Sequence, residues 1–424
     1  MLDFLNVVAG YVWGWPLMIL LVGTGLWLTF SLRALQFSHL IHAFGLIVRK
    51  TPDKKAQGDI SNFQALMVAL SATVGTGNIA GVATAIYIGG PGALFWMWMT
   101  GLVGMATKYA EAVLAVKYRV QNENGTFSGG PMYYIEKGAG QKWLAILFAL
   151  LGGIACFGIG NIAQSTEIAG AVQSLTGLDP LYTGIILAIL TAIVVIGGVK
   201  RIGQVASYLV PFMAMFYIVA GLAIIVLRIT DVPAALASIF TQAFSLEPRE
   251  IGGGVAGYTI MISMQQGVAR GVFSNEAGLG SAPMAHAASD TQEPVEQGMW
   301  GVFEVFVDTI VICTLTSMAI LLSGVLEYDL SSFASNGAAA AAAFNAILPG
   351  TIGGTVLQIS LLFFALSTIL GWSYYGERCW GYLSNNNKVV NVIFKIAFVL
   401  MCVVGSVGSG TLMWNISDTL NGMM

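Results

Sequence analysis

Long apolar stretches separated by short polar loops limit most strongly what this chain can fold into. A helix needs about 20 mostly apolar residues to cross a bilayer. Only 9% of the 424 residues are charged and 56% are hydrophobic, and so few charges cannot cover a globular surface in water. We therefore expect an all-α polytopic membrane protein. Its expected spans are 11–32, 62–89, 92–116, 143–174, 181–199, 204–227, 255–282, 297–323, 351–373 and 391–413.

The charges of the loops predict how the chain lies in the membrane. Most basic residues fall in alternate loops, at 33–61, 117–142, 200–201 and 378–388, whereas the remaining loops carry Arg228 and Arg249 beside several acids. Basic loops face the cytoplasm. The sequence therefore predicts a multi-pass protein of the cell membrane with its N-terminus outside. The net charge of −3 excludes the basic face that nucleic-acid binding needs.

The span 62–89 is interrupted at its centre. Gly75 and Gly77 flank Thr76, and Asn78 follows. Each glycine costs a helix interior about 1 kcal/mol, and a break at bilayer depth is tolerated only where it is buried in protein or lines a cavity. A break frees carbonyl groups that can hold a cation and amide groups that can hold an anion. The alternative is an unbroken helix with a glycine-rich packing face.

The span 255–282 is also unusual, because it places many polar side chains in the hydrophobic layer. They include Arg270 and Glu276, among several glycines. An arginine at a helix centre costs at least about 2.5 kcal/mol, so such residues indicate function by default. A buried Arg270–Glu276 pair that fixes helix packing is the alternative, and such a pair could also serve as a gate.

These two spans occupy matching places in two sets of helices. The span 255–282 is the fifth after 62–89, and an odd number of helices per repeat inverts the second copy. Matching interruptions are the sequence pointer to the binding site of an inverted-repeat transporter. We expect an extra transmembrane helix and basic loop in 1–61, a first five-helix repeat in 62–227 and a second, inverted repeat in 255–424. Only four spans fall in the second repeat, so its last helix is expected to be missing or truncated at Met424.

Two motifs resemble those of the alanine or glycine:cation symporter family, and the resemblance extends along nearly the whole chain. They are Ser71–Gly81 and Gly271–Pro283, the latter followed by Ala-His286-Ala. The resemblance implies a LeuT-like 5+5 inverted repeat preceded by one extra helix. It implies a sodium-coupled symporter that imports alanine or glycine by alternating access, with sodium as the co-transported ion. No enzymatic activity is expected. The expected partners are the substrate and membrane lipid, with no nucleic acid and no obligate protein partner.

The first motif is similar to the broken first core helix of LeuT-type transporters, and that similarity implies site residues. The amides of Thr76 and Gly77 would receive the substrate carboxylate, and the carbonyl of Thr73 and the side chain of Asn78 would match a second sodium site. The shared sodium site would be completed from the span 351–373. The expected substrate-binding residues are Thr73, Gly75, Thr76, Gly77, Asn78, Gln265, Gln266, Gly267 and Phe273, and the expected sodium ligands are Ser71, Val74, Phe364, Ser367 and Thr368.

Several alternatives remain open at this stage. Coupling to protons instead of sodium is the nearest, because Glu111, Glu167, Glu304 and Asp308 could relay protons or simply be buried hydrogen-bonding acids. An ion channel is less favoured, because channel filters are usually built by subunit symmetry. A hydrolytic triad of Ser281, His286 and Asp290 lacks a GxSxG elbow, and a solvated helix end is the favoured interpretation of that segment.

Overall fold

A computed structural model describes residues 13–48, 57–123, 125–251, 254–327, 333, 336–408 and 410–424. Within these ranges the first helices are α2 Trp15–Ser31, α3 Leu35–Ser38, α4 Leu40–Val48, α5 Asn62–Thr73, η1 Thr76–Asn78, α6 Ala80–Gly89, α7 Gly92–Lys117, α8 Pro131–Gly138, α9 Lys142–Phe157, η2 Gly158–Ile162, α10 Ala163–Thr176, α11 Pro180–Val195 and α12 Gly198–Leu227. The later helices are α13 Val232–Ala243, α14 Thr259–Asn275, α15 Pro283–Ala287, α16 Pro294–Val305, η3 Phe306–Cys313, α17 Thr314–Ser323, η4 Val325–Glu327, α18 Asn336–Ile347, α19 Ile352–Leu383, α20 Lys388–Val407 and α21 Gly410–Met423.

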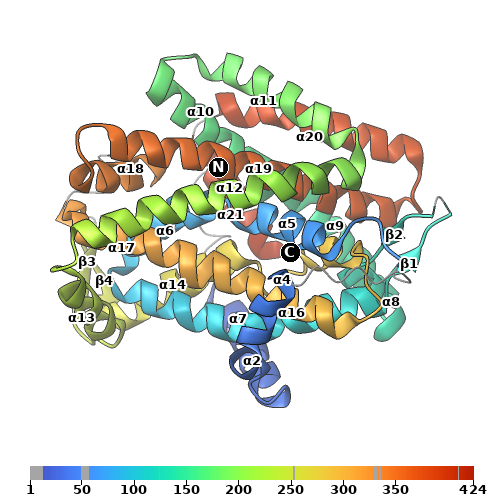
Figure 1. Ribbon diagram of the computed structural model, residues 1–424, viewed down its shortest axis with the longest axis horizontal. Coiled ribbons are helices and arrows are strands. Elements are labelled where there is room, and N and C mark those ends of the chain that lie inside the picture. The colour runs from blue at the N-terminus through green and yellow to red at the C-terminus, as the bar shows by residue number, and fades with distance from the viewer. Residues whose placement is uncertain are drawn as a thin grey trace.

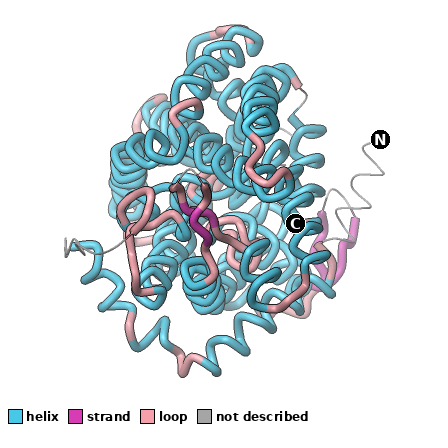
Figure 2. Tube along the Cα trace, turned by 90° about the vertical axis from the view of Figure 1, so that its right-hand side faces the viewer, coloured by secondary structure: helices cyan, strands magenta, loops and turns pink. Residues whose placement is uncertain are grey.

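The long helices run roughly along one axis of the molecule, so that Figure 2 views many of them nearly end on (Figures 1 and 2). Two small antiparallel hairpins lie at opposite ends of that axis: β1 Val120–Gln121 with β2 Phe127–Ser128, and β3 Pro248–Ile251 with β4 Gly254–Tyr258 (Figure 1). Continuous helical runs long and apolar enough to cross a membrane are Lys142–Thr176, Gly198–Leu227, Pro294–Ser323, Ile352–Leu383 and Lys388–Val407. The expected all-α polytopic architecture is therefore confirmed.

The interruption expected in the first motif is present. The helices on its two sides, Asn62–Thr73 and Thr76–Gly89, are bent by 56°. A capping box starts α5, since Ser61 accepts the N–H of Gln64 while the Gln64 side chain accepts the N–H of Ser61, which satisfies orphan donors at the helix start. The residues of the break, from Val74 to Asn78, are buried, as an opened backbone in a bilayer must be.

The second interruption lies later than the glutamines expected to line it. Helix α14 is continuous from Thr259 to Asn275, and the non-helical segment comes at 276–282, before the short helix α15. Positive φ angles mark this segment, at Glu276 (55°), Gly278 (95°) and Gly280 (77°). Glycine adopts such angles without a steric penalty, which explains why the two glycines stand here.

Other expectations need correction at the C-terminal end. The span expected at 391–413 ends as α20 at Val407, and a further helix, α21, follows from Gly410. Helix α21 packs against α9, α10 and η2 near the middle of the bundle (Figure 1). The alanine run Ala338–Ala343 was expected to form a short interfacial helix. It does form helix α18, but most of these alanines are buried against α6, α17 and α19, because a methyl side chain permits close helix packing.

Candidate functional site around the broken helix

The break in the first motif redirects backbone donors that a continuous helix would use internally. The N–H of Gly75 donates to Asn78 Oδ1 at 2.8 Å instead of to the carbonyl of Ser71. The N–H of Asn78 donates to the carbonyl of Gly75 at 3.2 Å instead of to that of Val74. The carbonyls of Ser71 and Val74 therefore lose their usual helical donors, and each retains oxygen lone pairs able to bind a cation.

Helix α19 brings hydroxyl groups beside these carbonyls. Ser367 and Thr368 both donate to the carbonyl of Phe364, at 2.8 and 3.0 Å, which leaves their oxygen lone pairs available. A methyl group added at Gly75 would overlap Thr368 Oγ1, and one added at Gly371 would come within 2.8 Å of Ser71 Oγ. The five expected sodium ligands thus come from one contact region between α5 and α19, and each is almost fully buried.

Gln164 lies at the site although the residues around it in the sequence form no recognisable motif. This residue is the second of α10, which follows the π-helical turn η2 directly. Its Oε1 accepts the N–H of Thr76 at 3.3 Å, and its Nε2 donates to the carbonyl of Ile159 at 2.9 Å. The hydroxyl of Thr76 is buried without a hydrogen-bond partner. A buried polar atom without a partner is costly, so this position is suited to a ligand with acceptor oxygens.

Aromatic rings cover the break on one side. A Cβ atom added at Gly77 would lie 3.0 Å from Cδ1 of Phe273, and the Phe273 ring lies 5.8 Å from the ring of Trp414 on α21. The guanidinium of Arg270 lies 5.6 Å from the Phe273 centroid. Phe273 therefore limits the space above Gly77, and Arg270 and Trp414 hold the ring in place.

Arg270 pairs with a different acid from the one considered in the sequence. Its two terminal nitrogens donate to the two carboxylate oxygens of Asp418 at 2.9 Å each. Glu276 instead accepts Trp372 Nε1 at 2.9 Å and the hydroxyl of Ser281. The Arg270–Asp418 bond joins α14 to α21, so a helix that the expected spans did not resolve supplies the partner of Arg270.

Asn78 links the break to the second half of the chain. Its Nδ2 donates to Ser274 Oγ at 2.8 Å and to Asp308 Oδ1 at 2.7 Å, and its carbonyl accepts the hydroxyl of Thr316. Asp308 also accepts the hydroxyls of Ser274 and Thr309. This buried carboxylate beside the break was noticed in the sequence only as one intramembrane acid among several.

The structure places the other expected pocket residues on intact helix. Gln265, Gln266 and Gly267 lie within α14, where a Cβ on Gly267 would collide with the Ala93 carbonyl and Trp96. Gly267 therefore permits close packing against α7. The Cβ of Gln266 would come within 2.9 Å of a Cβ on Gly89, at the far end of α6 from the break. Thr73 ends α5 and its hydroxyl donates to the carbonyl of Ala69 at 3.2 Å.

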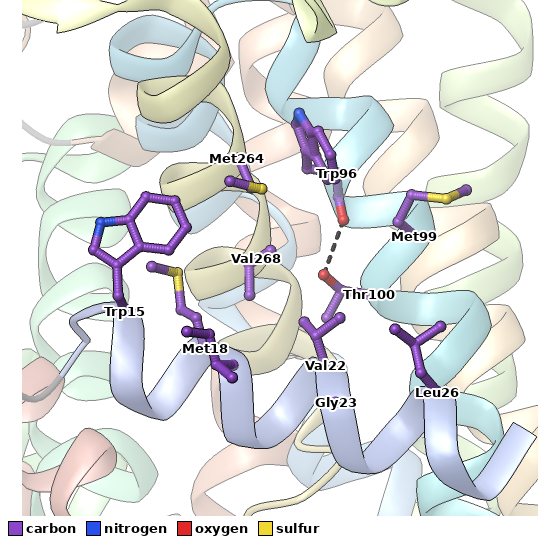
Figure 3. A pocket seen from close by; sticks show the side chains of 11 residues that line it. Trp15, Met18, Val22, Gly23, Leu26, Trp96, Met99, Thr100, Met264 and Val268 are labelled. Atoms are coloured by element: carbon purple, nitrogen blue, oxygen red, sulfur yellow. Dashed lines mark hydrogen bonds between the residues drawn. The ribbon is translucent and has the colours of Figure 1, made fainter.

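A separate cavity of about 300 Å³ lies between α2, α7 and α14 (Figure 3). Its lining is almost entirely apolar, with Trp15, Met18, Met99, Met264 and other side chains around it. The hydroxyl of Thr100 donates to the carbonyl of Trp96 at 2.8 Å. This cavity offers no partners for a zwitterion, whereas the break offers both amides and carbonyls.

A bundle of long apolar helices built around a buried helix break is the fold of LeuT-type transporters. The solved structure of MhsT in complex with L-phenylalanine matches with a TM-score of 0.59 and 15% identity, over 86% of this chain and 88% of that one. A Na+-coupled sialic acid symporter matches with a TM-score of 0.58 and 13% identity, over 94% of this chain and 82% of that one. At these identities the two structures show the fold.

The family follows from the sequence comparisons. The model of the sodium:alanine symporter family matches residues 1–424. The sodium/alanine symporter AgcS of Methanococcus maripaludis is 48% identical over 428 residues, which cover 100% of this chain and 92% of that protein. The chain belongs to the sodium:alanine symporter family, and it is a sodium-coupled membrane transporter. These comparisons confirm the family resemblance, the LeuT-like fold and the sodium coupling. The family is one of transporters and not of enzymes, as expected.

Proposed function

We propose that this chain imports alanine or glycine and that the break between α5 and α6 binds the amino acid together with sodium. The observation that carries this proposal is the redirected hydrogen bonding of Gly75, Thr76 and Asn78 at a buried site. A zwitterion needs donors for its carboxylate and acceptors for its ammonium group, and an opened helix provides both.

The substrate carboxylate would bind the amides of Thr76 and Gly77 at the start of α6. The oxygen of Gln164 now accepts the Thr76 amide, so it occupies the place that a carboxylate oxygen would take. On binding, Gln164 would turn its NH₂ group towards the carboxylate and the unpartnered hydroxyl of Thr76 would gain an acceptor. Phe273 would restrict the side chain of the substrate, which favours glycine and alanine over larger amino acids.

Sodium would bind the carbonyls of Ser71, Val74 and Phe364 with the hydroxyls of Ser367 and Thr368. These groups are hard oxygen donors, which suit an alkali cation without requiring a buried anion. Asn78 and the carbonyl of Thr73 were expected to form a second sodium site. The oxygen of Asn78 already accepts Gly75, and its amide group faces Asp308, which favours Asn78 as the residue that holds the break open.

The order of elements supports two inverted repeats of five. The first would comprise α5–α6, α7, α9–α10, α11 and α12, and the second α14–α15, α16–α17, α19, α20 and α21. Helix α2 would be the extra N-terminal span, and it packs mainly against α7. Counting α21 supplies the fifth member that the sequence spans lacked.

Orientation follows from the basic loops. The end of the bundle that carries β1, β2 and α8 would face the cytoplasm, with the N-terminus outside. The Arg270–Asp418 pair and Phe273 would then close the outer side of the site, and the segment 276–282 would lie on the cytoplasmic side. Alternating access would require the outer closure by Arg270, Asp418 and Phe273 and the cytoplasmic closure by residues 276–282 to open in turn.

Uptake of radiolabelled alanine into proteoliposomes tests this function. We expect uptake driven by an inward sodium gradient and lost when choline replaces sodium. Unlabelled glycine should compete, whereas phenylalanine should not. Uptake that ignores sodium but follows an imposed proton gradient would contradict the proposal in favour of proton coupling. Unitary current steps without substrate stoichiometry would contradict it in favour of a channel.

A further inference from the structure

A second buried polar cluster lies beside the interruption at 276–282, away from the proposed sodium ligands. Lys108 Nζ lies 3.3 Å from Glu304 Oε1, and both side chains are completely buried. Glu111 Oε1 accepts the N–H groups of Gly278 and Gly280 at 3.2 and 3.1 Å. His286 on α15 places its Nε2 2.9 Å from Glu304 Oε2. The segment was expected to be a solvated helix end, and the full burial of Ser281 and His286 shows that this interpretation was wrong.

The cluster contains more acidic than basic side chains. The carboxyl groups of Glu111, Glu276 and Glu304 face the single ammonium of Lys108, so three acidic groups share one basic partner. Tyr134 of α8 and Tyr375 of α19 face the same carboxylates and can add no positive charge. A buried carboxylate without a cationic partner is costly, so a carboxylate beside a proton-binding side chain favours the protonated form of that side chain. Of these side chains, histidine is the one that ordinarily changes its charge between pH 5 and 8.

The partners of His286 suit both of its charge states. In the neutral state, Nε2–H donates to Glu304 and Nδ1 accepts the Gln297 NH₂ group, 2.8 Å away. The other amide atom, Gln297 Oε1, is buried without a partner. A half-turn of this amide, whose O and N atoms are nearly equivalent in shape, would place Oε1 against a protonated Nδ1. The imidazolium would then donate to Glu304 and to Gln297.

We propose that His286 is a proton-binding site and that its proton governs the movement of α15 during transport. The proton comes from the cytoplasmic solution and adds to the Nδ1 lone pair, with no other bond made or broken. The charged His286 then pairs with Glu304 and ties α15 to α16. Arg119 extends this effect, because it donates to the carbonyls of Ala287, Ser289 and Gln57 and so links the end of α15 to the segment that precedes α5. Protonation therefore stabilises the closed cytoplasmic side, and uptake falls at acidic pH.

The small number of histidines permits a direct test. The chain has three, and His39 and His42 are exposed, so the variant H39Q/H42Q leaves His286 as the only imidazole in the protein. In ¹⁵N-histidine NMR of this full-length variant in nanodiscs, we expect the His286 nitrogens to move from the neutral to the imidazolium pattern between pH 8 and pH 5. This measurement does not depend on transport, so it can fail while the proposed function stands.

Uptake provides the second measurement. At a fixed sodium gradient and clamped voltage, we expect the H39Q/H42Q control to lose alanine uptake by about threefold or more from pH 8 to pH 6, and His286→Asn to remove this dependence. Gln297→Leu retains the histidine but removes the acceptor for the imidazolium, so it should move both the NMR transition and the uptake profile to lower pH. It also serves as the test if His286→Asn does not fold. The proposal is overturned if His286 stays in one state over this range, or if the uptake profiles of the substituted carriers match that of the control.

Discussion

The guanidinium of Arg270 and the carboxylate of Asp418 meet through two parallel hydrogen bonds of 2.9 Å across 148 residues of sequence. The pair is partly shielded, with side-chain exposures of 18% and 15%. It lies against Phe273, which packs over Gly77. The Arg270–Asp418 ion pair, the Phe273 ring and the break at Gly77 therefore lie in this order from α21 towards the proposed substrate position.

Loss of the Arg270–Asp418 bond should open this cover. Asp418→Asn leaves Arg270 without its charged partner. The loss of this bidentate pair removes both its interaction energy and the fixed position of α21 relative to α14. We expect a thiol reagent applied from outside to modify Cys313 about tenfold faster, which corresponds to about 1.4 kcal/mol. Cys313 is suitable because it is buried beside the break, 3.3 Å from Ser274 Oγ and 3.5 Å from Asn78 Nδ2.

The exposed pair Arg228–Asp231 provides the matched control for this experiment. Its side chains are 45% and 50% exposed, and surface ion pairs contribute little. Asp231→Asn should therefore leave the modification rate unchanged. Equal rates in Asp418→Asn and the unsubstituted protein would show that the pair does not close the site.

Removal of the Thr368 hydroxyl should weaken sodium binding. Thr368→Ala is expected to raise the sodium concentration for half-maximal uptake by about tenfold, and Thr368→Ser should retain most of the affinity. Ser360→Ala is the control, because Ser360 makes the same kind of hydrogen bond, to the carbonyl of Val356 at 2.9 Å, on the same helix. An unchanged sodium requirement in Thr368→Ala would exclude this residue as a ligand.

A side chain at Gly75 should abolish transport. The added methyl group would overlap the Thr368 hydroxyl and come within 3.4 Å of Gln164 Oε1, so Gly75→Ala should separate α19 from the break. We expect alanine uptake to fall below a tenth of the original rate. Gly170→Ala on α10 meets nothing within 4 Å and should transport normally. Normal sodium-dependent uptake by Gly75→Ala would contradict the close approach of the two helices.

Substitution of Gln164 should weaken the binding of alanine more than the binding of sodium. Gln164→Leu removes both the acceptor that satisfies the Thr76 amide and the NH₂ group proposed to bind the carboxylate. We expect the half-saturating concentration of alanine to rise by about tenfold or more, equivalent to about 1.4 kcal/mol, with the sodium requirement changed less. Gln358→Leu removes a half-buried glutamine that donates to the exposed Ser174, away from the break, and this variant should behave normally. A Gln164→Leu carrier with unaltered alanine dependence would remove Gln164 from the site.

The first break could be predicted from sequence because Gly75, Gly77 and Asn78 combine two helix-breaking residues with a side chain able to replace a backbone acceptor. The second could be located only to its span. Glycines serve two purposes there: Gly267 permits contact with α7, whereas Gly278 and Gly280 adopt positive φ angles. Residue type alone does not distinguish these purposes, so Gln265 and Gln266 were placed at a break that lies farther along the chain.

Long-range partners could not be predicted for a related reason. Arg270 has an acid six residues away in Glu276, and the sequence gives no indication that Asp418 lies closer in space. Gln164 and Asp308 likewise join the break from helices far along the chain. The apolar pattern identifies each helix, but the contacts between helices decide which buried polar groups meet.

A structure determined with sodium and alanine bound tests the central claim most directly. The account predicts the alanine carboxylate on the amides of Thr76 and Gly77, the Gln164 oxygen displaced from Thr76, and sodium among Ser71, Val74, Phe364, Ser367 and Thr368. Alanine bound elsewhere, with Gln164 still accepting the Thr76 amide, would contradict the account.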